Sequence, residues 1–452
     1  MSERVYKPKA ISGFPEWLPE YRAVELEWLD KIRRVFESYG FCNIETPIVE
    51  ELDALSAKGG ETEKEIYVIS RLHADENEKS EARLALHFDL TVPMARYVAQ
   101  HFNNLVFPFK RYQLQKSYRG ERPQKGRYRE FYQCDIDIVN IDALPLQCDA
   151  DVAAALLSAY QALDIPPVEM QLNNRKLILG FLAGLGITDS ALVTRTLDKL
   201  DKIGADGVRK ILTEGGLDAK AIDACLSLVS ISTADSSFAA QVRALGVSHP
   251  DLDTGIEELS FVIDQLAPQF GDKVAVNLGI IRGLDYYTGT VLEVRFKDQK
   301  QFGAASIGGG GRYEDLAGSF INQKLPGVGA SLGLTRLFGL LLDKGLIKAG
   351  KRSPTDILVV LPEESRRAVA AATAHQLRQR GFNVELYHRD AKVKNQLAYA
   401  EKKGVSYVWF PPFKDGQPHE VKNMQTGEQT GADAATWQPA CTNGEKTACA
   451  AC

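Results

Sequence analysis

The sequence has no long apolar run, and this absence excludes several classes of protein. No stretch of about 18 apolar residues occurs, so we expect no membrane-spanning helix and no membrane partner. The first nine residues are polar and lack the apolar segment of a signal peptide. We therefore expect a soluble chain that acts in the cytoplasm.

Cysteine is also scarce, with 7 in 452 residues. The first four are widely spaced and show no metal-ligand spacing, which indicates reduced thiols rather than a metal site. Cys449 and Cys452 form a C-x-x-C pair in the last residues, but no βαβ pattern surrounds them. A redox or metal role there stays open, and we interpret 441–452 as a disordered tail.

Positive charge is not in excess, because the formal net charge is −5. This argues against a protein that coats nucleic acid indiscriminately. It leaves open the binding of one nucleic acid through a local basic patch.

The pattern of apolar residues divides the first part of the chain into a helix and several strands. Three- to four-residue spacing predicts a helix over 19–39, and a strand follows over 41–49 with Pro47 near its end. Strands are predicted over 106–118 and 131–139. The basic segment 122–129 separates them, which indicates a hairpin with a long loop.

The later part of the chain contains two segments that differ in composition and apolar pattern from what precedes them. Residues 175–270 contain no Trp or Tyr and carry helical apolar patterns, so we predict a helical insertion there. Residues 344–354 form a linker rich in Lys, Gly and Ser. Strand and helix alternate beyond it, which predicts a separate α/β domain over 354–440. Its predicted elements are strand 356–361, helix 364–380, strand 384–387, helix 392–403 and strand 405–410.

The returning strand of the hairpin has one polar face. Strand side chains alternate, so Phe131, Gln133, Asp135 and Asp137 share a face and the apolar residues between them share the other. A solvated strand face is the plain alternative. Acids and amides are poor strand formers, which favours a ligand that holds them. Asp135 has no assigned role, and a local bulge would turn it away.

Three further segments combine glycine with arginine. The loop 122–129 is basic and aromatic, as suits phosphates or a single-stranded nucleic-acid end, although an ordinary solvated loop has the same composition. Arg282 follows an apolar strand, where its neighbouring tyrosines could equally be core residues. Arg336 lies in an otherwise apolar helix, where it must pair, meet a ligand or simply snorkel.

These segments together resemble the class II aminoacyl-tRNA synthetases. The hairpin resembles their motif 2, the glycine-rich entry to the Arg336 helix their motif 3, and the 19–49 helix and strand their motif 1. The segment 282–289, RGLDYYTG, is similar to a signature of the histidyl-tRNA synthetases. The resemblance implies an α+β fold: an antiparallel sheet flanked by helices in a catalytic domain over 1–345, with the helical insertion and a C-terminal α/β anticodon-binding domain. It also implies a homodimer.

The resemblance implies an ATP-dependent reaction that passes through histidyl-adenylate. Negative charge builds on phosphate oxygens, so the catalyst is mainly arginine and Mg²⁺, and the Mg²⁺ is expected to bind through the ATP phosphates. Arg119 and Arg282 are the implied catalytic residues. The implied ATP-binding residues are Arg119, Glu121, Arg127, Phe131 and Arg336.

The resemblance also assigns the amino-acid and tRNA contacts. The implied histidine-binding residues are Asp89, Thr91, Gln133, Asp137, Arg282, Tyr286 and Tyr287, with Asp137 and Tyr287 taking the imidazole nitrogens. The run 308–311 would let backbone approach the substrate closely. Gln124, Lys125 and Arg129 are the candidate contacts to tRNA(His).

Two alternative functions fit parts of the same pattern. One is a synthetase-like regulatory subunit of the ATP phosphoribosyltransferase of histidine biosynthesis. Such a subunit usually lacks the anticodon domain and varies in sequence at the motif arginines. The other is a synthetase for another amino acid, such as glycine or proline. The RGLDYYTG segment and Asp137 argue against the second.

Overall fold

The computed structural model describes residues 6–56, 64–72, 83–281, 287–303, 305–315, 317–318 and 320–439. The chain divides into two compact units. The first comprises 1–16 and 27–347, and the second comprises 17–26 and 348–452. The expected tail, 441–452, lies outside the described residues.

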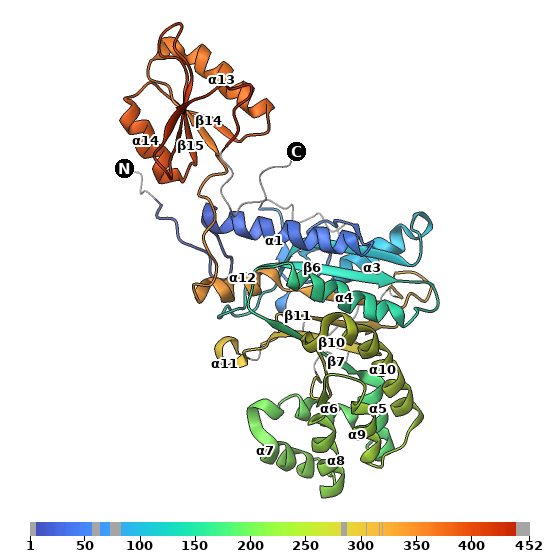
Figure 1. The fold of residues 1–452 in the computed structure, drawn as a ribbon. Helices are drawn as coiled ribbons and strands as arrows, with labels where there is room; N and C mark the ends of the chain where they lie inside the picture. Colours follow the sequence, from blue (N-terminus) through green and yellow to red (C-terminus); the bar gives the residue numbers. More distant parts are fainter. Residues whose placement is uncertain are drawn as a thin grey trace. The chain divides into compact units, whose positions relative to one another are not determined.

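A nine-stranded sheet organises the first unit (Figure 1). All neighbouring strands are antiparallel except the pairs β1–β5 and β7–β9. The predicted α+β class, with an antiparallel sheet flanked by helices, is confirmed. In spatial order the strands are β1 (Cys42–Asn43), β5 (Phe109–Tyr118), β6 (Glu130–Val139), β12 (Gly327–Leu332), β11 (Gly308–Tyr313), β10 (Thr290–Phe296), β7 (Val168–Asn174), β9 (Val274–Asn277) and β8 (Ser232–Thr233).

The predicted hairpin is the pair β5–β6. Its register runs one to one from the Phe109–Val139 pair to the Tyr118–Glu130 pair. No residue is left over, so the suggested bulge at Asp135 is wrong and Asp135 shares a face with Asp137. Arg119 and Glu121 follow the end of β5, which lies at Tyr118.

The two faces of this sheet differ in chemistry. Cys134, Ile136 and Ile138 point to the back face and are fully buried. Helix α4 (Gln147–Gln161) covers that face, and the hydroxyl of its Tyr160 donates to the carbonyl of Ile307 at 2.8 Å. The front face carries the polar residues of β6 and is described with the site below.

The segment predicted to be helical contains six helices and the two-residue strand β8, which joins the sheet. The first and last helices pack tightly because Gly180 and Gly255 lie at their contact, where a Cβ would collide with the facing backbone. The middle helices gather at one end of the unit (Figure 1). The six are α5 (Arg175–Gly184), α6 (Ser190–Leu197), α7 (Leu200–Glu214), α8 (Ala219–Val229), α9 (Phe238–Ala244) and α10 (Pro250–Phe270).

The N-terminal part of the chain forms smaller elements. The predicted strand over 41–49 is mostly irregular, with only β1 and the first residue of β2 in strands. A three-stranded sheet has the order β2–β4–β3. The elements are α1 (Pro19–Ser38), β2 (Val49–Glu51), α2 (Leu52–Ser56), β3 (Val68–Ile69), β4 (Leu84–Leu86) and α3 (Thr91–Gln100). Two further helices, α11 (Gln299–Phe302) and α12 (Leu334–Asp343), come late in the first unit.

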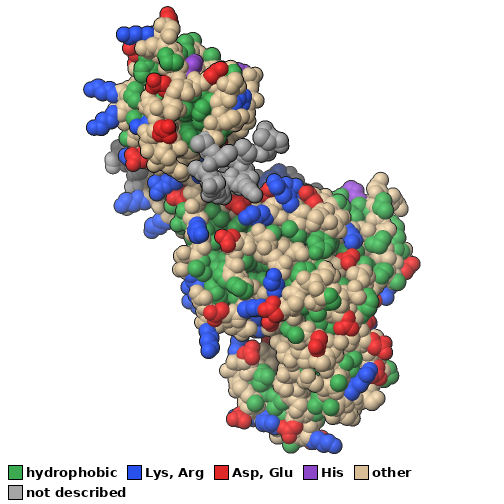
Figure 2. All heavy atoms as spheres, in the orientation of Figure 1, with side chains coloured by type: hydrophobic (Ala, Val, Ile, Leu, Met, Phe, Trp, Pro, Cys, Tyr) green, Lys and Arg blue, Asp and Glu red, His purple; other side chains and the backbone are tan. Residues whose placement is uncertain are grey.

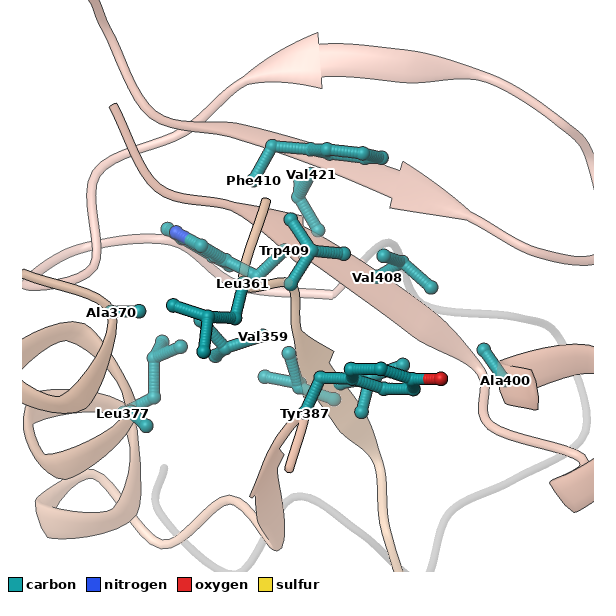
Figure 3. Packing of buried hydrophobic residues seen from close by; sticks show 14 of the residues in the cluster. Val359, Leu361, Ala370, Leu377, Tyr387, Ala400, Val408, Trp409, Phe410 and Val421 are labelled. Carbon is teal, nitrogen blue, oxygen red and sulfur yellow. The ribbon is translucent and has the colours of Figure 1, made fainter. Parts of the chain in front are cut away.

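The second unit is a five-stranded sheet between helices (Figure 1). Its core is apolar, and Figure 3 shows Trp409, Leu361 and Tyr387 packed with other members of the cluster. The predicted helices and first three strands are present, while the last two strands were not predicted. The elements are β13 (Ile357–Val359), α13 (Arg367–Gln379), β14 (Val384–Leu386), α14 (Val393–Lys403), β15 (Tyr407–Phe410), β16 (Glu420–Asn423) and β17 (Gln429–Gly431).

The surface shows no broad region of one charge on the face seen in Figure 2, where acidic and basic side chains are interspersed. Among the described helices, none is long and apolar enough to cross a membrane.

Candidate active site

A cleft of about 280 Å³ opens on the front face, where β6, β11 and β12 meet the hairpin loop and α12. Its size is near the lower end of the range for small-ligand sites, about 300–1,000 Å³. It brings together residues from segments far apart in the sequence. Five predicted ATP-binding residues are among those that line it: Arg119, Glu121, Arg127, Phe131 and Arg336.

Arg119 is fixed at the end of β5. Its Nε donates to the carbonyl of Phe88 at 3.0 Å, and its guanidinium lies 5.1 Å from the ring centre of Phe131. This is a cation–π contact, which restrains the arginine while leaving other N–H groups to bind an anion. The geometry suits a residue that must hold a phosphate in a fixed place.

Arg336 reaches the cleft from the first turn of α12. It donates to the carbonyls of Gly126 at 2.8 Å and Ser306 at 3.0 Å. Burial lowers its pKa, and the neighbouring Arg127 and Arg119 lower it further. The two carbonyl contacts explain how an arginine persists on an apolar helix, and the clustered cations make the cleft attractive to phosphate.

The hairpin loop closes with a tight turn in which Gln124 and Arg127 exchange backbone hydrogen bonds, and Gly126 has a positive φ of 73°. Arg127 pairs with Glu121 at 2.8 Å. The side chains of Gln124 and Lys125 are exposed, whereas Arg129 is half-buried and donates to the carbonyl of Glu121 at 3.0 Å. Two of the three candidate tRNA contacts therefore face solvent.

Beyond the inner end of the cleft, Asp137 and Tyr287 lie over a pair of glycines. Gly329 is opposite Asp137 in the sheet, and Gly311 is opposite Gly329. A Cβ at Gly329 would collide with the Asp137 carboxylate, and a Cβ at Gly311 would lie 2.7 Å from Cγ of Tyr287. The glycines thus let an acid and a phenol approach one another on the front face.

Asp137 is already paired within the protein. Arg111, which is fully buried, forms an ion pair with it, and the hydroxyl of Tyr313 donates to its Oδ1 at 2.9 Å. The charge of Asp137 is therefore balanced within the protein before any imidazole binds.

A row of polar side chains on β5 was missed by the sequence analysis. Arg111, Gln113 and Gln115 lie opposite Asp137, Asp135 and Gln133. Gln113 donates to Oγ1 of Thr46 at 2.9 Å, and Gln115 donates to the backbone carbonyl of Thr46 at 2.8 Å. The alternation of these residues with Tyr112 and Leu114 was the available signal, since it matches the polar alternation on β6.

Burial raises the pKa of both acids on β6. The pKa of Asp135 rises to about 7 and that of Asp137 to about 6, with Arg111 opposing both shifts. Burial also raises the pKa of Tyr287, and the charge of Asp137 raises it further. Tyr287 is therefore a neutral phenol at neutral pH, able to donate or accept.

Asp89 begins α3. Its Oδ1 accepts from the backbone N–H of Thr91 at 3.2 Å and of Val92 at 3.1 Å. Its charge acts on Asp135, Asp137 and Tyr287, so it lies near the inner end of the cleft. Arg282 and Tyr286 lie outside the described residues.

An antiparallel sheet with flanking helices and an arginine-lined cleft is the architecture of a class II aminoacyl-tRNA synthetase. The sequence profile described as histidyl-tRNA synthetase matches residues 13–337, and that of an anticodon binding domain matches 356–435. The chain belongs to the histidyl-tRNA synthetase family.

Individual relatives agree with this assignment. Histidine–tRNA ligase of Thermobifida fusca is 56% identical, with 97% of this chain and 100% of the relative covered. The crystal structure of histidyl-tRNA synthetase from Nostoc sp. PCC 7120 superposes with a TM-score of 0.84 at 35% identity, covering 95% of this chain and 98% of that one.

A more distant structure shares the fold alone. An ATP phosphoribosyltransferase regulatory subunit/histidyl-tRNA synthetase from Bacillus halodurans has a TM-score of 0.74 at 19% identity, covering 90% of this chain and 99% of that one.

Proposed function

We propose that this chain joins L-histidine to tRNA(His) in two steps. The carboxylate of histidine attacks the α-phosphorus of ATP, which forms histidyl-adenylate and releases pyrophosphate. A ribose hydroxyl of the terminal adenosine of the tRNA then attacks the activated carbonyl and releases AMP. The observation that carries the proposal is an arginine-lined cleft that leads to a buried acid–phenol pair, Asp137 and Tyr287.

The cleft is the proposed ATP site. Arg119 stabilises the charge that develops on the α-phosphate, and Arg127 leaves Glu121 to meet the distal phosphates. Phe131 and Arg336 enclose the adenine, and Glu121 accepts from its amino group. Arg282 contributes from the opposite side by family resemblance. Mg²⁺ binds through the phosphates, and Glu121 is the only carboxylate among the described residues that line the cleft.

The polar front face beyond the cleft is the proposed histidine site. Asp137 and Tyr287, with Tyr286 nearby in sequence, take the imidazole, while Asp89, Thr91 and Gln133 take the amino group. Arg111 and Tyr313 hold Asp137 in position before the substrate arrives. Such a prepared site discriminates strongly against amino acids that cannot make both ring contacts.

The tRNA meets two separate parts of the chain. The second unit binds the anticodon stem, and the exposed side chains of Gln124 and Lys125, with Arg129 behind them, meet the acceptor end. The match of 356–435 to an anticodon binding domain supports the first contact. The reaction takes place in the cytoplasm, where charged tRNA is used.

The active form is a homodimer. Exposed apolar side chains of the small sheet and the segment before it support this proposal, since such side chains are usually covered in an assembly. They are Ile48, Val68, Ile69 and Leu84, which are 38–58% exposed. Light scattering should give about twice the chain mass of 49.9 kDa; the mass of a single chain in the active fraction would refute the dimer.

Pyrophosphate exchange into ATP, measured with each amino acid separately, tests the function. Histidine alone should support exchange, and the same preparation should then charge tRNA(His). A regulatory subunit would support no exchange, and a synthetase for another amino acid would respond to that amino acid instead.

A further inference from the structure

Two adjacent side chains on the front face of β6 have oxygens without partners. Gln133 donates from Nε2 to the hydroxyl of Ser331 at 3.2 Å, and that hydroxyl donates to Asp135. The remaining acceptors, Oε1 of Gln133 and Oδ1 of Asp135, have no hydrogen-bond partner and are shielded from solvent. Ser331 therefore fixes both side chains while leaving one oxygen free on each.

An oxygen left in this way is unfavourable for the protein on its own. Asp135 is only 4% exposed, and a buried carboxylate is normally fully hydrogen-bonded or paired with a cation. Asp137, which is equally buried, has both Arg111 and Tyr313. The contrast between two acids on one strand indicates that the partner of Asp135 comes from outside the chain.

The charge of the surroundings favours a cation as that partner. The negative charges of Asp137 and Asp89 act unfavourably on an ionised Asp135. The positive charge of Arg111 opposes them, but Arg111 is already paired with Asp137. Burial raises the pKa of Asp135 to about 7, and a cation bound at Oδ1 would favour the ionised form again. An ammonium group supplies both a positive charge and several N–H donors.

The order of residues along the sheet distinguishes the two ends of the amino acid. Gln133 and Ser331 line the cleft proposed for ATP, Asp135 is opposite Ser331, and Asp137 lies two residues further from the cleft. The carboxylate of histidine must face the ATP, so its α-carbon end lies toward the cleft and its ring lies deeper. Asp135 is thus beside the α-carbon end.

We propose that Asp135 is a substrate-binding residue whose Oδ1, together with Oε1 of Gln133, accepts hydrogen bonds from the α-ammonium of histidine. This proposal rests on the proposed function and deepens it. It gives Asp135 a contact that a purely structural acid would lack. It also explains why Ser331 holds the two side chains with their free oxygens unpaired.

The test uses the full-length chain with Asp135→Asn, which keeps the shape and removes the charge. Histidine-dependent pyrophosphate exchange gives the KM of histidine and of ATP. Two competitive inhibitors separate the ends of the substrate: histidinol keeps the ammonium and imidazole, and imidazolepropionic acid keeps the imidazole and carboxylate but lacks the ammonium.

Glu293→Gln is the matched control. Glu293 is another buried acid on the same face, but its Oε2 is already held by Arg295 at 2.7 Å. Loss of the Glu293 carboxylate in this variant should lower the melting temperature and leave the KM of histidine nearly unchanged. Asp135→Ala serves as a second variant, since it removes both oxygens without adding an amide donor.

For Asp135→Asn we expect the KM of histidine and the inhibition constant of histidinol to rise together by about 10- to 100-fold, as for a lost charge-assisted hydrogen bond. The inhibition constant of imidazolepropionic acid and the KM of ATP should change little, and the melting temperature of the free protein should not fall.

Four results would overturn the proposal. Equal weakening of both inhibitors would place Asp135 at the imidazole, and unchanged values for both would exclude contact with the substrate. Equal loss for ATP and histidine with a lower melting temperature would make it a structural acid. A wild-type chain without histidine-dependent exchange would refute the proposed function itself, and this proposal with it.

Discussion

The two units of this protein bury their sheets in opposite ways. In the second unit, Ile357 to Leu361 and Trp409 are completely buried and apolar. In the first unit, Arg111 and Gln113 are as completely buried, and Asp135 and Asp137 are nearly so. Removing apolar surface from water stabilises a fold, whereas burying polar groups does so only when each is paired.

This difference separates the part of the chain that contributes stability from the part that is prepared for a ligand. The apolar sheet of the second unit buries side chains that need no hydrogen-bond partner. Much of the polar face is paired with neighbours on β5 and with Tyr313, and the acceptor oxygens of Gln133 and Asp135 are among the buried atoms that lack a hydrogen-bond partner. Substitutions on the two sheets should therefore have different consequences.

The largest effect on stability alone is expected at Trp409 in the second unit. Trp409→Ala removes a fully buried ring and should destabilise that unit by about 3–5 kcal/mol. Denaturant unfolding followed by circular dichroism measures this loss. Histidine-dependent exchange should persist under conditions where the first unit stays folded; its disappearance there would contradict the separation of roles.

Asp137→Ala should affect both stability and binding. It leaves Arg111 buried without its partner, which typically lowers the free energy of unfolding by about 3–5 kcal/mol, and it also removes a histidine contact.

The double variant Arg111→Met/Asp137→Asn separates these effects. It should recover much of the stability, as measured by denaturation, but not the KM of histidine. Recovery of both would show that Asp137 acts only as a partner of Arg111.

Arg119→Ala should lower the rate of adenylate formation by about 10²- to 10³-fold, the usual effect of removing one donor to a developing anion. Its contacts with Phe88 and Phe131 are local, so the melting temperature should change little. Single-turnover formation of the adenylate measures this rate. A rate close to that of the wild type would remove Arg119 from the mechanism.

The sequence predicted the hairpin well because Phe131 to Val139 alternates strictly, and the alternation fixed the face of Asp137. It did not reveal that Arg111 pairs with Asp137, because an ion pair between strands depends on register, and the geometry of the long loop that fixes this register could not be predicted. Gly308 to Gly311 form part of a central strand, although glycine is a poor strand former. The neighbouring side chains of Tyr160 and Tyr287 occupy the space there, and only the fold shows this.

The smallest effect is expected from pH. The pKa of Asp135 is about 7 in the folded protein against an ordinary 3.8, so the folded state binds a proton that the unfolded state releases between these values. Its contribution to stability is present below pH 4 and is lost as the pH rises through 7.

The melting temperature of the wild type should therefore fall more between about pH 5 and about pH 8 than that of Asp135→Asn, by the equivalent of at least about 1.4 kcal/mol. Parallel pH profiles would mean that Asp135 has the same pKa in both states.

The most direct test of the central claim is a crystal structure of this chain with histidine and a non-hydrolysable ATP analogue. We expect the imidazole between Asp137 and Tyr287, the α-ammonium at Gln133 and Asp135, and the adenine between Phe131 and Arg336. Histidine bound away from the polar face of β6, or an ammonium that leaves Oδ1 of Asp135 without a partner, would contradict it.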